Sequence, residues 1–119
     1  MSDKSDMAER FRVRWPELFT EVECGFWAPE GWELLLIELC EQIAPLIGPD
    51  FRVAQVKEKF GGLRFYCSGS NAEVDDLIWA AEAASVETCQ GCGWPGTRRG
   101  KGWIQTLCKE CAEEKPETD

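Results

Sequence analysis

Histidine is absent from this 119-residue sequence, which removes the commonest general base and metal ligand from its possible chemistry. Long apolar runs are absent too. The longest aliphatic run, Leu34–Ile37, is far shorter than the roughly 20 residues of a membrane-spanning helix. The first ten residues are polar and charged and lack the apolar segment of a secretory signal. We therefore expect a cytoplasmic protein with no membrane partner.

Basic residues are missing from two long segments. No Lys or Arg lies between Trp15 and Phe51, or between Phe65 and Thr97, although both segments are rich in carboxylates. The net charge is −9, and many of the cations fall into three small groups: Arg10, Arg12 and Arg14; Lys57, Lys59 and Arg64; Arg98, Arg99 and Lys101. Such segregation favours a partner selected by charge, while the overall sign opposes loose binding to a polyanion.

Two CxxC pairs near the C-terminus are the strongest chemical signal. Cys89 and Cys92 form the first pair, Cys108 and Cys111 form the second, and fifteen residues separate the pairs. This spacing is typical of a zinc ribbon, in which four thiolates hold one tetrahedral Zn²⁺. Four protein ligands leave no open coordination position, so we expect a structural metal. Disulfides or a redox-active pair are the alternatives, but no secretory signal or thioredoxin-like pattern accompanies them.

The remaining pattern predicts an α+β fold, with two main helices packed on a β-hairpin or small antiparallel sheet. Apolar residues recur at helical spacing over residues 30–44, and a second helix is expected to reach Val86 after a capping box at Ser70. Residues 51–57 and 63–67 read as two strands, with Leu63, Phe65 and Cys67 on one face. A strand is also expected over residues 103–107.

The segments outside these elements are expected to be less regular. We predict a flexible tail over residues 1–10, an α+β domain over 11–87, a zinc ribbon over 88–112 and an acidic tail over 113–119. Alternating residues over 11–15 suggest a short strand or a lead-in, Pro16 suits a short helix through Thr20, and residues 24–29 read as a loop. Cys24, Cys40 and Cys67 form no ligand pair and are expected to be buried free thiols.

The segment from Gln55 to Tyr66, QVKEKFGGLRFY, resembles a family of small uncharacterised zinc-ribbon proteins encoded by bacteria and their phages. The resemblance covers most of residues 15–111. It includes Cys24, Gly31-Trp32, Leu39-Cys40, Ala81-Glu82, Cys92-Gly93, Pro95-Gly96, Gly102-Trp103 and Thr106–Cys108. Related sequences can carry histidine at the last ligand position, where this chain has Cys111. The resemblance implies a phage-type origin, a bacterial host and the zinc site, but no activity.

The acidic segment favours a binding protein whose partner is another protein. A helix displaying Glu30, Glu33, Glu38 and Glu41 could occupy the basic groove of a nucleic-acid-binding protein. This arrangement would suit an inhibitor of a host nucleic-acid-handling or CRISPR-type defence complex, an anti-CRISPR-like role. The simpler interpretation is a solvated polar face. No nucleophile motif or open metal site indicates a reaction, so we do not expect an enzyme.

The alternative is a zinc-ribbon protein that binds nucleic acid or assists transcription. Arg98, Arg99 and Lys101 lie between Trp94 and Trp103, a composition found in proteins that bind single strands by stacking and charge. In the simpler interpretation both tryptophans cover the metal core and the cations solvate an exposed turn.

Overall fold

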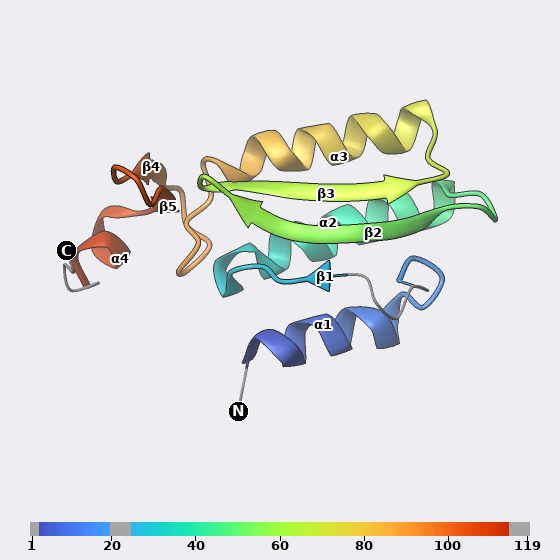
Figure 1. The fold of residues 1–119 in the computed structure, drawn as a ribbon, viewed down its shortest axis with the longest axis horizontal. Coiled ribbons are helices and arrows are strands. Elements are labelled where there is room, and N and C mark those ends of the chain that lie inside the picture. The colour runs from blue at the N-terminus through green and yellow to red at the C-terminus, as the bar shows by residue number, and fades with distance from the viewer. Residues whose placement is uncertain (1–2, 20–24, 115–119) are drawn as a thin grey trace.

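The computed structural model describes residues 3–19 and 25–114. In chain order the elements are helix α1 (Asp3–Arg14), strand β1 (Gly25–Phe26), 3₁₀ helix η1 (Glu30–Trp32), helix α2 (Glu33–Ile43), 3₁₀ helix η2 (Ala44–Leu46), strands β2 (Arg52–Lys59) and β3 (Gly62–Ser68), helix α3 (Ala72–Ser85), strands β4 (Thr97–Arg99) and β5 (Gln105–Leu107), and helix α4 (Lys109–Glu114). The fold is α+β, as the sequence predicted: helices pack on a small sheet, and a C-terminal hairpin carries the four cysteines (Figure 1).

The main sheet has the strand order β1-β2-β3, with β1 parallel to β2 and β2 antiparallel to β3. Helix α2 runs behind this sheet in Figure 1, α3 lies along β3, and α1 lies beyond β1. The strand β1 is a correction, since residues 24–29 were expected to be a loop. It adds a third strand to the predicted hairpin, which two strands alone would leave marginally stable.

The β2–β3 hairpin closes with a two-residue turn. Lys59 pairs with Gly62, and the intervening Phe60 and Gly61 have φ angles of 55° and 83°. Two successive positive φ values define the type I′ turn that matches the twist of a hairpin. Leu63 and Phe65 are buried and Cys67 is partly buried on one face, while Tyr66 is exposed on the other, as the alternation predicted.

The free edge of β3 is covered by side chains of α3. The buried Ser85 hydroxyl accepts a hydrogen bond from the Leu63 amide at 2.8 Å, and the Glu82 carboxylate accepts one from the Phe65 amide at 3.0 Å. These two bonds satisfy strand amides that would otherwise be open to a further strand. Helix α3 therefore supports the hairpin and does not merely pack against it.

The N-terminal prediction was wrong. Residues 3–14 form the helix α1, where a flexible tail to residue 10 and a strand or lead-in from Phe11 were expected. Met7, Phe11 and Trp15 recur at a spacing of four residues and are all buried in the core. The alternation of arginine with apolar residues obscured this helical stripe. Pro16–Leu18 forms only a turn, and Thr20 lies outside the described residues.

Helix α2 follows its prediction closely, but the start of α3 needs a correction. The capping residue of α3 is Asn71, whose side chain accepts a hydrogen bond from the Val74 amide at 2.9 Å. Ser70 instead donates to the Asp75 carboxylate at 2.6 Å. An asparagine oxygen caps a helix as well as a serine hydroxyl does, so the capping-box spacing placed the cap one residue too early.

The hydrophobic core lies between the sheet and the helices. Its fully buried large side chains include Met7, Phe11, Leu18, Trp32, Leu36, Leu39, Ile43, Val53, Val56, Leu63 and Val74. Cys40 is a buried free thiol, as predicted, and burial raises its pKa to about 12. Cys67 is free but only partly buried, and burial raises its pKa as well. Cys24 lies outside the described residues.

Candidate metal centre

The four cysteines of the two CxxC pairs lie at one end of the molecule, in a segment here called the ribbon (residues 88–111). Cys89 and Cys92 are on the turn that follows α3, and Cys108 and Cys111 flank the start of α4. The antiparallel pair β4–β5 returns the chain and brings the two turns together. A local spacing of three residues within each pair and a short hairpin between the pairs are therefore sufficient to assemble the cluster.

The sulfur atoms have the separations of a tetrathiolate metal site. All four Sγ atoms lie within 4.8 Å of one another, and those of Cys92 and Cys108 are 3.7 Å apart. Metal–sulfur bonds of about 2.3 Å in a tetrahedron place the sulfurs about 3.8 Å apart. A disulfide requires about 2.05 Å, so the Cys92–Cys108 distance fits shared coordination and not a covalent bond. The cluster could hold a metal ion, and its donor set is typical of a zinc ribbon.

Backbone amides point at two of the sulfurs. The Gly91 amide donates to the Cys89 sulfur at 3.3 Å, and the Cys111 amide donates to the Cys108 sulfur at 3.4 Å. Such bonds stabilise thiolate charge and orient metal ligands. Gly93 has a positive φ, 88°, and its amide donates to the Cys89 carbonyl at 2.9 Å. Its part is to close the first turn.

The thiols of the cluster differ in pKa, which is lowered at Cys89 and raised at Cys111. Burial of Cys89 opposes its ionisation, but hydrogen bonds from the backbone of Cys108, Cys92 and Gly91 outweigh burial and lower its pKa to about 6. The pKa of Cys111 is raised, chiefly by its hydrogen bonds to Cys89 and Cys108. One thiolate thus forms readily, whereas four adjacent anions require a cation to offset their repulsion.

Buried polar contacts attach the ribbon to the rest of the fold. The Gly31 amide donates to the Gln90 carbonyl at 2.9 Å, and the indole of Trp32 donates to the Thr88 carbonyl at 2.9 Å. The Thr106 hydroxyl donates to the Gly61 carbonyl at 2.7 Å. The ribbon therefore contacts both the start of α2 and the tip of the β2–β3 hairpin.

Gln90 and Thr106 are site residues that sequence reasoning missed. The Gln90 backbone amide donates to the Thr106 carbonyl at 2.8 Å, and the Thr106 amide donates to the Gln90 side-chain oxygen at 2.8 Å. Both residues are buried. Gly31 approaches so closely that an added Cβ would lie 2.2 Å from the Cys89 carbonyl oxygen. The sequence offered only two hints: the polar Gln90 between the ligands Cys89 and Cys92, and the dipeptide Gly31-Trp32. Neither hint indicates which distant residue is contacted.

Arg98 and Arg99, two of the predicted ribbon cations, are neighbours on β4. Adjacent residues of a strand point to opposite faces. The Arg98 guanidinium lies 3.5 Å from the Phe60 carbonyl, whereas the Arg99 side chain donates to the Leu107 carbonyl at 2.8 Å. Lys101 is exposed, and Trp94 and Trp103 are 69% and 78% exposed. Those exposures contradict the interpretation that the tryptophans cover the metal core.

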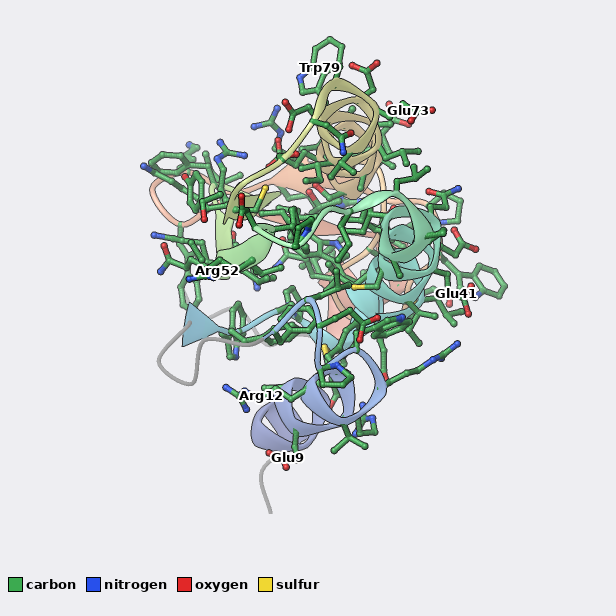
Figure 2. The ribbon with its side chains drawn as sticks, turned by 90° about the vertical axis from the view of Figure 1, so that its right-hand side faces the viewer. Glu9, Arg12, Glu41, Arg52, Glu73 and Trp79 are labelled. Carbon is green, nitrogen blue, oxygen red and sulfur yellow. The ribbon has the colours of Figure 1, made fainter. Side chains whose placement is uncertain are left out.

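The predicted acidic face is partly neutralised within the molecule. Arg10 pairs with Glu33 and Arg14 pairs with Glu41, each at 2.6 Å, so α1 supplies cations to α2. Figure 2 labels Glu41 on α2, above α1 in that view. Glu38 remains exposed on α2, and Glu30 is exposed at η1. Two of the four predicted glutamates, Glu33 and Glu41, are therefore engaged in ion pairs with α1.

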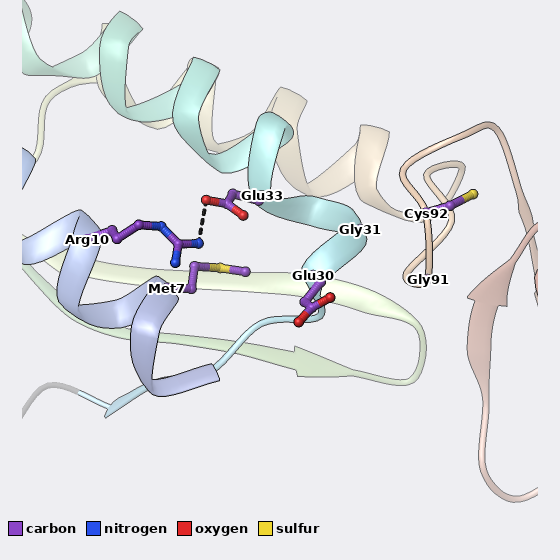
Figure 3. A pocket seen from close by; sticks show the side chains of 7 residues that line it. All are labelled: Met7, Arg10, Glu30, Gly31, Glu33, Gly91 and Cys92. Carbon is purple, nitrogen blue, oxygen red and sulfur yellow. Dashed lines mark hydrogen bonds and ion pairs between the residues drawn. The ribbon is translucent and has the colours of Figure 1, made fainter. Parts of the chain in front are cut away.

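A polar cleft of about 370 Å³ separates α1 from the first metal turn, lined by Met7, Arg10, Glu30, Gly31, Glu33, Gly91 and Cys92. Figure 3 shows the Arg10–Glu33 ion pair on one side and the Cys92 sulfur directed away from that pair. The cleft does not gather a nucleophile with an activating base. It gives no indication of a catalytic site.

The chain matches no protein-family model, and no curated protein or solved structure is significantly similar to it. The resemblance to phage-encoded zinc-ribbon proteins therefore stays a prediction beyond the four-cysteine cluster itself. Among the described helices, none has both the length and the apolar character needed to cross a membrane.

Proposed function

We propose that this protein is a non-enzymatic zinc-binding protein whose metal is structural. The observation that carries the proposal is the cluster of four sulfur atoms within 4.8 Å of one another. Two of these sulfurs accept hydrogen bonds from backbone amides. Zinc prefers four thiolates in tetrahedral geometry, and a site with four protein ligands has no position for a substrate or a reactive water. The metal would hold the ribbon, and recognition would be left to surfaces around it.

Metal analysis of the purified chain tests this proposal. We expect about one zinc per chain, and we expect Cys108→Ser to reduce the content sharply because one ligand is lost. Cys67→Ser is the matched control, since Cys67 is a free thiol outside the cluster and its replacement should leave the zinc content unchanged. Wild-type protein that purifies without zinc and does not take it up would contradict the proposal.

We further propose that the exposed carboxylates of α2 and α3, here called the acidic helical side, bind a basic partner protein. Helices α2 and α3 carry three and four carboxylates respectively, with no Lys or Arg in either. Glu38, Glu73 and Asp76 are exposed. Charge complementarity of this kind accelerates association and selects partners. A host nucleic-acid-handling or CRISPR-type defence complex, which this protein would inhibit, has the basic surface that such a side would fit.

Exposed apolar groups support a protein partner on this side. Leu34 of α2 is 73% exposed and Trp79 of α3 is 74% exposed. Trp79 also lines a cleft of about 530 Å³ between α3 and β3, together with Tyr66 and Asp75. Protein interfaces commonly centre on a tryptophan surrounded by polar residues. The combination favours a protein surface over a small-molecule site.

The test is affinity capture from a bacterial host lysate, followed by mass spectrometry. A basic protein should be retained by the wild type and lost by the double variant Glu38→Lys/Asp76→Lys. The control is Glu9→Lys/Glu17→Lys, which changes the charge equally on and just after α1. Retention of the same proteins by both double variants would show that the acidic helical side is not the binding surface.

A further inference from the structure

Two cationic groups that are distant in the sequence meet at the tip of the β2–β3 hairpin. Lys57 and Arg64 are directly opposite each other in the β2–β3 register, and Lys59 lies two residues further toward the turn. The Arg98 side chain arrives from the ribbon, with Nη1 at 3.5 Å from the Phe60 carbonyl oxygen. Its Cδ is 3.2 Å from the position that a Cβ on Gly61 would occupy. Four cations from three strands therefore share one small surface.

These cations have no acidic partners in the described part of the chain. The ion pairs formed there all use arginines of α1, and none involves Lys57, Lys59, Arg64 or Arg98. Arg64 donates to the carbonyl of its neighbour Leu63 at 3.1 Å. The nearby Glu58 carboxylate accepts a hydrogen bond from the Gly61 amide at 2.8 Å, which holds it at the turn. The balance of charge at the tip remains positive.

The hairpin tip also departs from what stability alone would select. Like charges directly opposite on neighbouring strands are destabilising, yet Lys57 faces Arg64. Phe60 has a φ of 55°, where asparagine or glycine is favoured, and this large apolar residue is 55% exposed. Local conflicts of this kind are expected where a sequence serves binding at the expense of stability. Several of them coincide at this one turn.

We propose that single-stranded nucleic acid binds this hairpin-tip surface, made by Lys57, Lys59, Phe60, Arg64 and Arg98. Closely spaced cations match a phosphate backbone, and an exposed ring beside them offers a face on which a base can stack. The Lys59 ammonium lies 5.6 Å from the centre of the Phe60 ring, which places charge and stacking face together.

The neighbouring charges define where this surface ends. Tyr66 is exposed on the same strand as Arg64, but it lines the cleft that contains Asp75, Asp76 and Glu82. The carboxylates would repel phosphates there. The bound nucleic acid is therefore expected to run from the hairpin tip toward the ribbon and not along β3. At 0.1 M salt, charges more than about 10 Å away are largely screened, so the acidic helices weaken this binding without abolishing it.

The experiment measures fluorescence anisotropy of labelled dT20 and rU20 with the zinc-loaded full chain, at salt concentrations from 50 to 300 mM. Neutralisation of four phosphate contacts predicts a slope of log K against log salt of about −3, from about −0.7 per contact for single strands. Lys57→Gln/Arg64→Gln should reduce the slope to about −1.4. Relief of the like-charge pair should at the same time raise the Tm of this variant, an outcome that a purely structural role does not produce.

Two further variants separate the ring from the charge. Phe60→Asn suits the positive φ, so it should keep or raise the Tm while weakening binding about tenfold through loss of stacking. Lys59→Glu should weaken binding more than Arg12→Glu, a reversal of equal charge on α1. Tighter binding of rU20 than dT20 would assign RNA as the ligand, and the reverse would assign DNA.

Three results would overturn the proposal. The first is no anisotropy change with either oligonucleotide at 50 mM salt, and the second is wild-type affinity in the hairpin-tip variants. The third is displacement of dT20 by polyglutamate at equal charge concentration, which would assign the surface to acidic polypeptides. Zinc content is measured on the same samples, so loss of the metal site is distinguished from loss of nucleic-acid binding.

Discussion

The body of the molecule and its ribbon are stabilised in different ways. Every member of the hydrophobic core lies between Met7 and Ala81, so the helices and the main sheet are held by apolar burial. The ribbon buries Cys89, Gln90, Thr106 and Leu107 and exposes both of its tryptophans. Too little apolar surface is buried there to offset the conformational entropy of ordering the chain. The sulfur cluster and the contacts with Gly31, Trp32 and Gly61 must supply the remainder.

The comparison extends to charge. The arginines of α1 are paired with glutamates, two of them across the interface with α2, so these charges are neutralised within the fold. The cations at the junction of hairpin and ribbon have no such partners among the described residues. Charges in the first region serve the fold, whereas those in the second are available to a ligand. The following predictions test this division, beginning with the largest effect.

Removal of the metal should separate the two regions. Zinc contributes roughly 10–16 kcal/mol to small structural sites, so chelation should abolish the order of the ribbon. Hydrogen exchange followed by mass spectrometry should show that residues 88–111 lose protection while α2, β2 and β3 retain it. Re-addition of Zn²⁺ should restore the original pattern. Simultaneous loss of protection in the body would mean that the regions are not independent.

A cavity in the body should have the opposite effect. Leu36 is completely buried, and Leu36→Ala should lower the free energy of unfolding by about 2–5 kcal/mol. Urea denaturation followed by far-UV circular dichroism measures this change. The zinc content of the folded variant should stay at the wild-type value, because Leu36 is not part of the cluster. Loss of zinc before the body unfolds would contradict the division.

Coupling between the regions is tested at Gly31. An alanine there would place its Cβ 2.2 Å from the Cys89 carbonyl oxygen, so the ribbon must shift. We expect a cost of about 1–3 kcal/mol, measured by thermal unfolding, together with a weaker zinc affinity in a chelator competition. Gly48→Ala is the matched control, since no atom lies within 4 Å of its added Cβ. Equal effects of the two substitutions would show that close packing at Gly31 is unimportant.

The smallest effect is expected at the ion pairs of α1. Glu41→Gln removes the partner of Arg14, but both side chains are about half exposed, so the stability should change by less than about 1 kcal/mol. Glu38→Gln is the control, because the Glu38 carboxylate makes no ion pair with a described residue. The difference in unfolding free energy between the two variants, measured by urea denaturation, gives the contribution of the Arg14–Glu41 pair. A change of several kcal/mol would mean that α1 depends on charge more than on Met7, Phe11 and Trp15.

The features that the sequence predicted well are those set by short-range pattern. The spacing within each CxxC pair, the helical recurrence of apolar residues in α2 and the turn of the hairpin each depend on a few neighbouring residues. The identity of the cluster followed directly from this spacing. The helix α1 was missed because its apolar stripe is narrow and its arginines imitate the alternation of a strand.

Long-range contacts could not be predicted in the same way. The close approach of Gly31 to Cys89, the hydrogen bond from Thr106 to Gly61 and the meeting of Arg98 with the hairpin all join segments far apart in the chain. No local pattern specifies such contacts, because they depend on how complete elements pack. The pairing of Glu33 and Glu41 with α1 was hidden for the same reason.

X-ray absorption at the zinc edge of the purified protein is the most direct test of the central claim, that four thiolates enclose one structural metal. We expect a single shell of four sulfur scatterers at about 2.3 Å. A fitted oxygen or nitrogen scatterer at about 2.0–2.1 Å in place of a sulfur, or an edge signal too weak for one zinc per chain, would contradict it.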